Sequence, residues 1–190
     1  MNQWEVLEIL EREGAVQKGH YLLSSGLHSD TYVQCAKVLQ YPHLAESLAN
    51  EIAREAENLL PELVISPAMG GIIIGYMVAL ALRTRMVFAE RQEGRMTLRR
   101  GQQVREGERA VIVEDVITTG GSVQEIAQLV QEHGGVVVGL GAIIERGEDR
   151  DFGVPKKVLL RLDAPVWKPE ECPLCVQGSK LEIPGSRRAG

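Results

Sequence analysis

The chain has 190 residues, enough for one well-buried domain, and its formal net charge of −5 disfavours general binding to a nucleic-acid backbone. No apolar run approaches the roughly 20 residues that span a bilayer, and residues 1–5 lack the basic and apolar regions of a signal peptide. The three cysteines require no disulfide, so the expected location is the cytoplasm.

The N-terminal segment predicts a short amphipathic helix over residues 3–13. It places Trp4, Leu7 and Leu10 on one helical face among several glutamates, and Gly14 ends it. Packing against the rest of the fold is the only role that this pattern indicates.

Residues 20–34 predict a strand, a polar turn and a second strand. Small residues that are common in turns lie in the middle of the segment: Ser24, Ser25 and Gly26. The two histidines near this turn, His20 and His28, are interpreted as turn residues rather than catalysts.

A first strand–loop–helix unit follows a structural helix that begins at Pro42 and ends at Pro61. A short buried strand over residues 63–66 leads into a loop of small residues and then an apolar helix over 72–82. Glycines in such a loop let backbone amides approach an anion closely. The candidate residues are Ala68, Met69, Gly70 and Gly71. A plain helix N-terminus is the alternative interpretation.

A strand over residues 86–89 leads into a segment, 90–101, with little apolar content. Four arginines flank its glycine turn: Arg91, Arg95, Arg99 and Arg100. Charged runs usually form solvated hairpins. The alternative, which we favour, is a mobile arm that closes over a pyrophosphate and neutralises it with planar guanidinium groups.

The central motif covers residues 111–122. An apolar, β-branched run predicts a buried strand, and the adjacent carboxylates of Glu114 and Asp115 follow where that strand should end. A loop of threonines and glycines then leads to a helix N-terminus, an arrangement that suits a phosphate. The carboxylates fit a ligand that also carries hydroxyls or a divalent cation, as a sugar phosphate with Mg²⁺ does. The lysine of a Walker loop is missing. An ordinary turn with a capping box from Ser122 to Glu125 is the alternative.

The next buried strand, over residues 136–144, is followed by Arg146 at its carboxyl end, where ligands lie in an open parallel sheet. The guanidinium fork of Arg146 suits a carboxylate and ring oxygens; a surface salt bridge is the alternative. One more strand covers 157–162.

Beyond residue 165, the Cys-x-x-Cys of Cys172 and Cys175 indicates half of a zinc site or a redox pair. Cys35 is a possible third ligand, and two such units can meet across a dimer, but reduced turn cysteines are favoured.

Residues 114–122 resemble the phosphoribosyl pyrophosphate (PRPP) motif of type I phosphoribosyltransferases. The Leu-Ser-Ser-Gly segment at 23–26, Arg146 and the Cys-Pro-Leu-Cys tail resemble orotate phosphoribosyltransferases. Alternating strands and helices predict an α/β fold with a parallel sheet. The resemblance, which covers nearly the whole chain, implies one domain over 1–190: an open parallel sheet flanked by helices at about 41–162, and a small hood from about 1–40 plus part of 163–190.

The resemblance also implies the site. Contacts to PRPP are expected from the central motif, the first glycine loop and the arm: Glu114, Asp115, Val116, Ile117, Thr118, Thr119, Gly120, Gly121, Ser122, Ala68, Met69, Gly70, Gly71, Arg91 and Arg95. Contacts to orotate are expected from Thr118, Arg146, Ser24, Ser25 and Gly26. The catalytic residues are Glu114 and Asp115, and Mg²⁺ is held near them mainly through PRPP, pyrophosphate and water. Many relatives carry lysine at the positions of Ser24 and Gly70, and a histidine in the arm, which this chain lacks.

The implied activity is transfer of ribose 5-phosphate from PRPP to orotate, giving orotidine 5′-monophosphate and pyrophosphate in pyrimidine biosynthesis. The implied assembly is a homodimer with shared active sites, with no nucleic-acid or membrane partner. Two alternatives stay open: a phosphoribosyltransferase for another base, and a PRPP-sensing regulator on the same fold.

Overall fold

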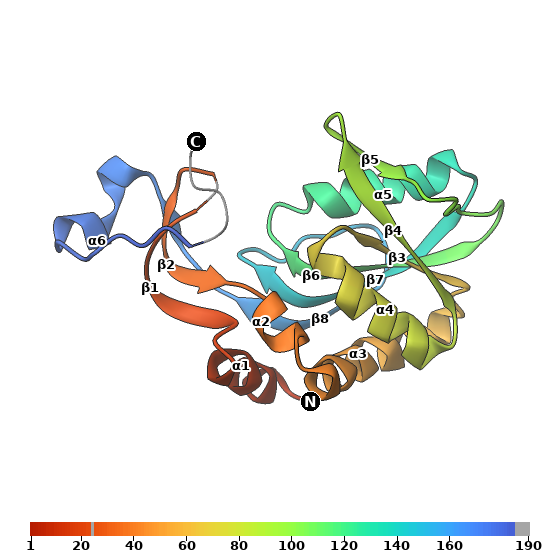
Figure 1. Cartoon of the computed structure of the whole chain (residues 1–190), viewed down its shortest axis with the longest axis horizontal. Helices are drawn as coiled ribbons and strands as arrows, with labels where there is room; N and C mark the ends of the chain where they lie inside the picture. Colours follow the sequence, from red (N-terminus) through yellow and green to blue (C-terminus); the bar gives the residue numbers. More distant parts are fainter. Residues whose placement is uncertain (24, 185–190) are drawn as a thin grey trace.

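The computed structural model describes residues 1–23 and 25–184, which form a six-stranded sheet flanked by helices and a separate three-stranded sheet (Figure 1). The order of the larger sheet is β5-β4-β3-β6-β7-β8. Its strands are β3 (Leu63–Pro67), β4 (Arg85–Gln92), β5 (Arg95–Leu98), β6 (Arg109–Ile117), β7 (Val136–Arg146) and β8 (Lys156–Leu162). All neighbouring strands pair in parallel except β4 and β5, which form an antiparallel hairpin at the edge. The predicted open α/β sheet is therefore confirmed.

Helices cover both faces of this sheet, so its central strands are apolar on both sides. On β6, Val111 and Val113 face the core beneath α3 (Pro42–Ala56) and α4 (Gly70–Leu82). Their neighbour Ile112 faces the opposite core, beneath α5 (Gly121–Glu132). The alternation of side chains along a strand explains this division.

The N-terminal helix α1 (Gln3–Arg12) is confirmed, but its buried face differs from the predicted one. Val6 and Leu10 are buried, whereas Trp4 is 80% exposed. Because the helix turns about 100° per residue, Trp4 lies roughly 160° around the axis from Val6. Leu10 belongs to the main core, as does Val38 of α2 (Ala36–Leu39). Helices α1 and α2 are therefore packed on the main core, and only part of residues 1–40 forms the small sheet.

The hood, defined here as residues 16–33 and 165–184, is built on the small sheet. Strands β1 (Val16–Leu22) and β2 (His28–Val33) pair antiparallel, and β9 (Val166–Trp167) adds to the other edge of β2. A short 3₁₀ turn at Pro169–Glu171 and the short helix α6 (Pro173–Val176) follow β9. The remaining 3₁₀ turn, Glu57–Leu59, ends α3. In Figure 1 the orange strands of the hood and the blue C-terminal segment lie side by side, away from the larger sheet.

The interpretation of His20 and His28 as turn residues was wrong. They lie in β1 and β2 and are 2% and 5% exposed. The turn between the strands lies at residues 23–27, where Gly26 has a φ of +82° and donates its N–H to Leu23 O at 2.9 Å. Ser24 lies outside the described residues. Within the described part of the chain, no helix is both long and apolar enough to cross a membrane.

Candidate active site

The acidic pair, Glu114 and Asp115, lies inside strand β6, which extends to Ile117. The sequence had placed the pair where the strand ends, so the strand is longer than predicted. Glu114 is buried, and its Oε1 accepts a hydrogen bond from the backbone N–H of Asp115 at 3.0 Å. Burial, followed by the side-chain hydrogen bond with Asp115 and the negative charge of Asp115, raises the pKa of Glu114 to about 9, whereas the backbone hydrogen bond opposes this shift. In the free protein at neutral pH, Glu114 is therefore protonated, and a cationic or hydroxyl-bearing ligand favours its ionised form.

The first glycine loop is in direct contact with this acidic pair. A Cβ atom on Gly70 would overlap the carboxylate of Asp115, and one on Gly71 would lie 3.0 Å from Val113 O. Only glycine allows α4 to begin this close to β6. The start of α4, which follows the loop after β3, therefore lies against the end of β6. That the loops after β3 and β6 form one binding site stays a prediction. A lysine at position 70 would have no room in this arrangement.

The second loop leads from β6 to α5 through exposed Thr118 and Thr119. Gly120, at the N-cap of α5, has a φ of +82°, and no side chain in the described part of the chain caps this helix. Apart from a long hydrogen bond from Gly121 N–H to Thr119 Oγ1 at 3.5 Å, the amides at the start of α5 are left for an anionic ligand, as at other helix N-termini that bind phosphate. Ile117 is buried beneath α5, so only its backbone can face a ligand.

The capping box between Ser122 and Glu125, which was the alternative interpretation of this turn, does not form. Glu125 instead pairs with Arg91 Nη2 at 2.8 Å, so the alternative interpretation of this turn as an ordinary capped helix is not supported.

Arg146, at the end of β7, connects the larger sheet to the hood. Its Nη2 donates to Ser29 Oγ at 2.6 Å and its Nε to Ala164 O at 3.4 Å. Among the described residues it takes part in no ion pair with a carboxylate, contrary to the alternative interpretation as a surface salt bridge. Since Glu145 pairs in register with Ile117 on β6, Arg146 lies beside Thr118. A half-buried cation is thus held next to the phosphate loop.

Two residues that the sequence did not single out surround Arg146. Ser29 orients it, and Ser29 Oγ in turn donates to Pro165 O at 2.8 Å. The negative charge of Asp30 acts on Arg146, although burial is the larger influence and lowers the pKa of the guanidinium. Both residues follow shortly after the Leu-Ser-Ser-Gly segment at 23–26, which was the nearest available signal for them.

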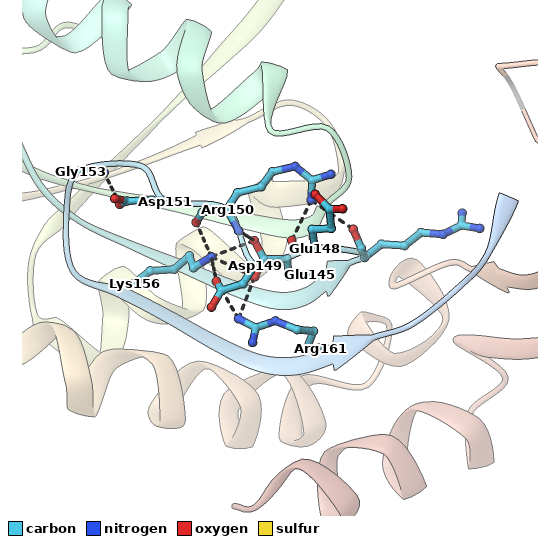
Figure 2. Close-up of polar contacts among 9 residues, drawn as sticks. Glu145, Glu148, Asp149, Arg150, Asp151, Gly153, Lys156 and Arg161 are labelled. Atoms are coloured by element: carbon cyan, nitrogen blue, oxygen red, sulfur yellow. Dashed lines mark hydrogen bonds and ion pairs between the residues drawn. The ribbon is translucent and has the colours of Figure 1, made fainter.

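A buried ion network supports the backbone on either side of Arg146. Figure 2 shows the carboxylates of Glu145 and Asp149 together with the cations of Lys156 and Arg161. Lys156 Nζ lies 2.8 Å from Glu145 Oε1, and Arg161 Nη2 lies 3.2 Å from Glu145 Oε2. Glu145 is fully buried, which by itself opposes ionisation, but the hydrogen bonds from Lys156 and its neighbours hold its pKa below the ordinary value. The network therefore fixes the strand end that presents Arg146.

The arm is a hairpin of β4 and β5 that extends along α5 (Figure 1). Besides its ion pair with Glu125, Arg91 donates to Gly94 O at 2.6 Å. Arg95 is exposed on β5. These contacts hold Arg91 against α5 rather than against the acidic pair of the same chain. They do not decide between a solvated hairpin and a mobile arm that closes over a pyrophosphate.

Cys35 is not a partner of the Cys-x-x-Cys unit, which corrects one possibility left open by the sequence. It is buried at the start of α2, with its Sγ 3.9 Å from Asp115 O. Burial, with nearby Asp115 and Glu114, raises the pKa of the Cys35 thiol well above its ordinary value. Its position beside Asp115, away from Cys172 and Cys175, is what separates Cys35 from the Cys-x-x-Cys unit.

Comparison with known proteins agrees with this geometry. Residues 37–170 match the family model of the phosphoribosyl transferase domain. The chain belongs to the phosphoribosyltransferase family.

The full-length relatives of this chain carry a more specific name. It is 52% identical over 183 residues to the orotate phosphoribosyltransferase of Thermotoga petrophila, covering 96% of this chain and 98% of that protein. It is 48% identical over 189 residues to the orotate phosphoribosyltransferase of Caldanaerobacter subterraneus subsp. tengcongensis, covering 99% and 100%. The crystal structure of orotate phosphoribosyltransferase from Aeropyrum pernix is 25% identical, with a TM-score of 0.70 over 83% of this chain and 93% of that one.

Proposed function

We propose that this protein transfers ribose 5-phosphate from PRPP to orotate, producing orotidine 5′-monophosphate and pyrophosphate in pyrimidine biosynthesis. The observation that carries the proposal is Arg146, a cation held by Ser29 beside the phosphate loop without a carboxylate partner among the described residues. The charge suits the carboxylate of orotate. Relatives with this name share about half of their residues with the chain over nearly its full length.

The chemistry follows from the arrangement of charges. The amides at the start of α5 bind the 5′-phosphate, and Glu114 and Asp115 bind the ribose hydroxyls. The bond from the anomeric carbon to pyrophosphate breaks ahead of attack by the deprotonated ring nitrogen of orotate, so the ribose becomes cationic. The two carboxylates stabilise that charge electrostatically, and the nucleophile needs no strong general base. Catalysis is therefore mainly orientation and electrostatics.

The acidic pair also fits Mg²⁺, because a neighbouring cation favours the ionised form of two adjacent carboxyl groups whose charges otherwise repel. Glu114 and Asp115 lie near where it would sit, with most ligands supplied by PRPP, pyrophosphate and water. When bound, Mg²⁺ would supply positive charge to offset the charge of the departing pyrophosphate.

The active form that we propose is a homodimer located in the cytoplasm, with the arm of each chain reaching the site of its partner. Its supporting feature is an exposed apolar stripe along α4 that begins in the first glycine loop: Met69, Ile73, Tyr76 and Leu80. The spacing places these side chains on one face of the helix, and a patch of this kind suits a second copy of the chain. A shift from dimer to monomer in Tyr76→Asp, measured by light scattering, is the expected result; a monomeric wild type would refute the dimer.

The direct test is the loss of orotate absorbance with PRPP and Mg²⁺, run beside adenine, hypoxanthine, xanthine and uracil. Loss of orotate that requires both PRPP and Mg²⁺, with the other bases inert, is expected. Turnover of another base would keep the PRPP site and refute the role of Arg146. Binding of PRPP without turnover of any base, together with an electrophoretic shift of nucleic acid at physiological salt, would favour the regulator.

A further inference from the structure

Four potential metal ligands meet in the hood, away from the proposed active site. His20 comes from β1 and His28 from β2, while Cys172 immediately precedes α6 and Cys175 is its third residue. The ligand atoms of all four lie within 4.8 Å of one another. The histidines are separated from the cysteines by about 150 residues of sequence, since His20 and Cys172 are 152 positions apart. The fold alone brings the four together.

The separations match those of a tetrahedral zinc site. His20 Nε2 lies 3.0 Å from His28 Nδ1. Cys172 Sγ is 3.5 Å from His20 Nε2, and Cys175 Sγ is 3.7 Å from His20 Nε2 and 3.3 Å from His28 Nδ1. With usual zinc–nitrogen and zinc–sulfur bonds, tetrahedral geometry places two nitrogens about 3.3 Å apart and a nitrogen about 3.5 Å from a sulfur. One ion therefore fits between these atoms with only small shifts.

A hydrogen bond to a backbone carbonyl sets the tautomer of His20 so that its Nε2 can bind a metal. Its Nδ1 lies 3.0 Å from Ser179 O, and since a carbonyl oxygen only accepts, Nδ1 carries the proton. The lone pair of Nε2 then points toward the other three ligand atoms. Metal-binding histidines usually donate their second N–H to a carbonyl or carboxylate in this way, which fixes the tautomer and the ring orientation.

We propose that His20, His28, Cys172 and Cys175 bind one structural Zn²⁺ ion. Two thiolates and two imidazoles in a tetrahedron are a ligand set that selects zinc over oxygen-binding cations such as Mg²⁺. Four protein ligands leave no open position, so the ion is structural rather than catalytic. His20, His28 and Cys172 are buried and Cys175 is exposed, so the ion lies just below the surface.

Two arrangements without a metal are possible, hydrogen bonds among the free side chains or a disulfide, and neither satisfies all four groups. The single lone pair of His20 Nε2 faces three groups, a second imidazole and two thiols, but accepts one hydrogen bond from them. A Cys172–Cys175 disulfide would give a redox pair, but it would leave two buried imidazoles facing one another with no role. Zinc satisfies all four groups together.

The ion would link the C-terminal segment to β1 and β2, the two strands that are joined by the turn expected to contact orotate. The ligands His20 and His28 flank the turn at residues 23–27, and His28 is followed directly by Ser29, which orients Arg146. The tail is further joined to β1 through Glu182, whose O accepts from Leu22 N at 2.9 Å. If the proposed function holds, loss of zinc weakens orotate binding more than PRPP binding; the site itself does not depend on that function.

The test is the metal content of the untagged full chain, purified under a reducing agent without chelator. About one zinc per chain is expected, falling at least tenfold in Cys175→Ser and His28→Ala. Cys35→Ala and His43→Gln serve as controls and should keep the metal, since Cys35 is remote from the cluster and His43 is exposed on α3. Because Cys175 is exposed, its variant is expected to fold. Replacement of zinc by Co²⁺ should give the visible absorption of a tetrahedral thiolate site in the wild type and the two controls, but not in Cys175→Ser or His28→Ala.

Less than a tenth of an equivalent of zinc in the reduced wild type, with no tetrahedral Co²⁺ spectrum after addition of the metal, would overturn the proposal. Full zinc content in Cys175→Ser and His28→Ala would also overturn it. Neither measurement involves turnover, so failure here is distinguishable from failure of the proposed enzymatic function.

Discussion

Gly70 and Asp115 lie so close together that a single Cβ atom on Gly70 would overlap the Asp115 carboxylate. The two residues come from different strand–helix connections, one at the start of α4 and one near the end of β6. Their contact makes the two loops one site, and it fixes where the Asp115 carboxylate can lie.

Gly70→Ala should therefore lower turnover without unfolding the protein. The added methyl group displaces the Asp115 side chain, and kcat/KM should fall roughly tenfold or more, equivalent to about 1.4 kcal/mol of transition-state stabilisation. Stability should change by less than about 1 kcal/mol, because alanine is favoured over glycine within a helix. Steady-state kinetics and denaturant unfolding measure the two effects.

The control for this variant is a double-mutant cycle. Asp115→Asn should by itself cripple turnover while the fold survives. If Gly70→Ala acts through the Asp115 carboxylate, it should cost little more in the Asp115→Asn background. Equal losses in both backgrounds would show that Gly70 acts in another way.

Glu114→Gln should make the protein more stable at alkaline pH and less active. Burial and Asp115 raise the pKa of Glu114 from 4.5 to about 9, so the folded state keeps a proton that the unfolded state releases. Wild-type stability therefore falls as pH rises from about 4.5 to about 9. Glutamine removes this loss, and at pH 8.5 the variant should gain about 1 kcal/mol or more, a Tm rise of roughly 2–4 °C.

Unfolding curves of both proteins at pH 5.0, 7.0 and 8.5 check this expectation. The difference between variant and wild type should grow with pH. A difference that stays constant across the three values would mean that Glu114 is ionised in the free protein.

The sequence predicted the main sheet well because its signals are local. The β-branched runs before each glycine loop correspond to β3, β6 and β7. The strand, glycine loop and helix around the acidic pair were predicted in the right order because they lie within one short segment, while the roles of these residues in binding stay predictions. By contrast, Trp4 was assigned to the wrong helix face, because three apolar residues in a short helix do not decide which of them meets the core.

The contacts that the sequence missed join distant segments. Ser29 and Arg146 are 117 positions apart, and His20 and Cys172 are 152 apart. Neither histidine shows a metal-site spacing by itself, because antiparallel strands bring them together only through the register of β1 and β2. A single Cys-x-x-Cys unit therefore remained ambiguous until the fold supplied its partners.

Arg146→Ala should reduce kcat/KM for orotate roughly 10- to 150-fold, as expected when a charged hydrogen bond worth about 1.5–3 kcal/mol is lost. Ser29→Ala keeps the charge but removes the contact that orients it, so a smaller loss of roughly 3- to 10-fold is expected, mostly in the KM for orotate.

Ser47→Ala is the matched control, because the Ser47 hydroxyl is exposed on α3 and contacts only His43 O. It should have kinetics like those of the wild type. Unchanged kinetic constants for orotate in Arg146→Ala would refute the base-site assignment.

Lys156→Met should destabilise the fold, because it leaves the buried carboxylate of Glu145 with weaker compensation. Removing one partner of a buried ion pair costs about 3–5 kcal/mol, and the lower end is expected here because Arg161 still pairs with Glu145. Lys157→Met is the matched control. Its ion pair with Glu55 is 3.4 Å long and more exposed, so its loss should cost less than about 0.5 kcal/mol.

The loss in Lys156→Met should also depend on pH. The ion pairs hold the pKa of Glu145 below its ordinary value of 4.5, so their stabilisation is present above that pH and is lost as the pH falls through the lowered pKa. The gap between Lys156→Met and wild type should therefore narrow progressively as the pH falls, because Lys156 compensates the ionised form of Glu145. Urea unfolding at pH 7 and near pH 3 measures this gap. An equal gap at both values would mean that Lys156 stabilises the fold by packing on Phe152 rather than by charge, since its Nζ also lies 5.5 Å from that ring.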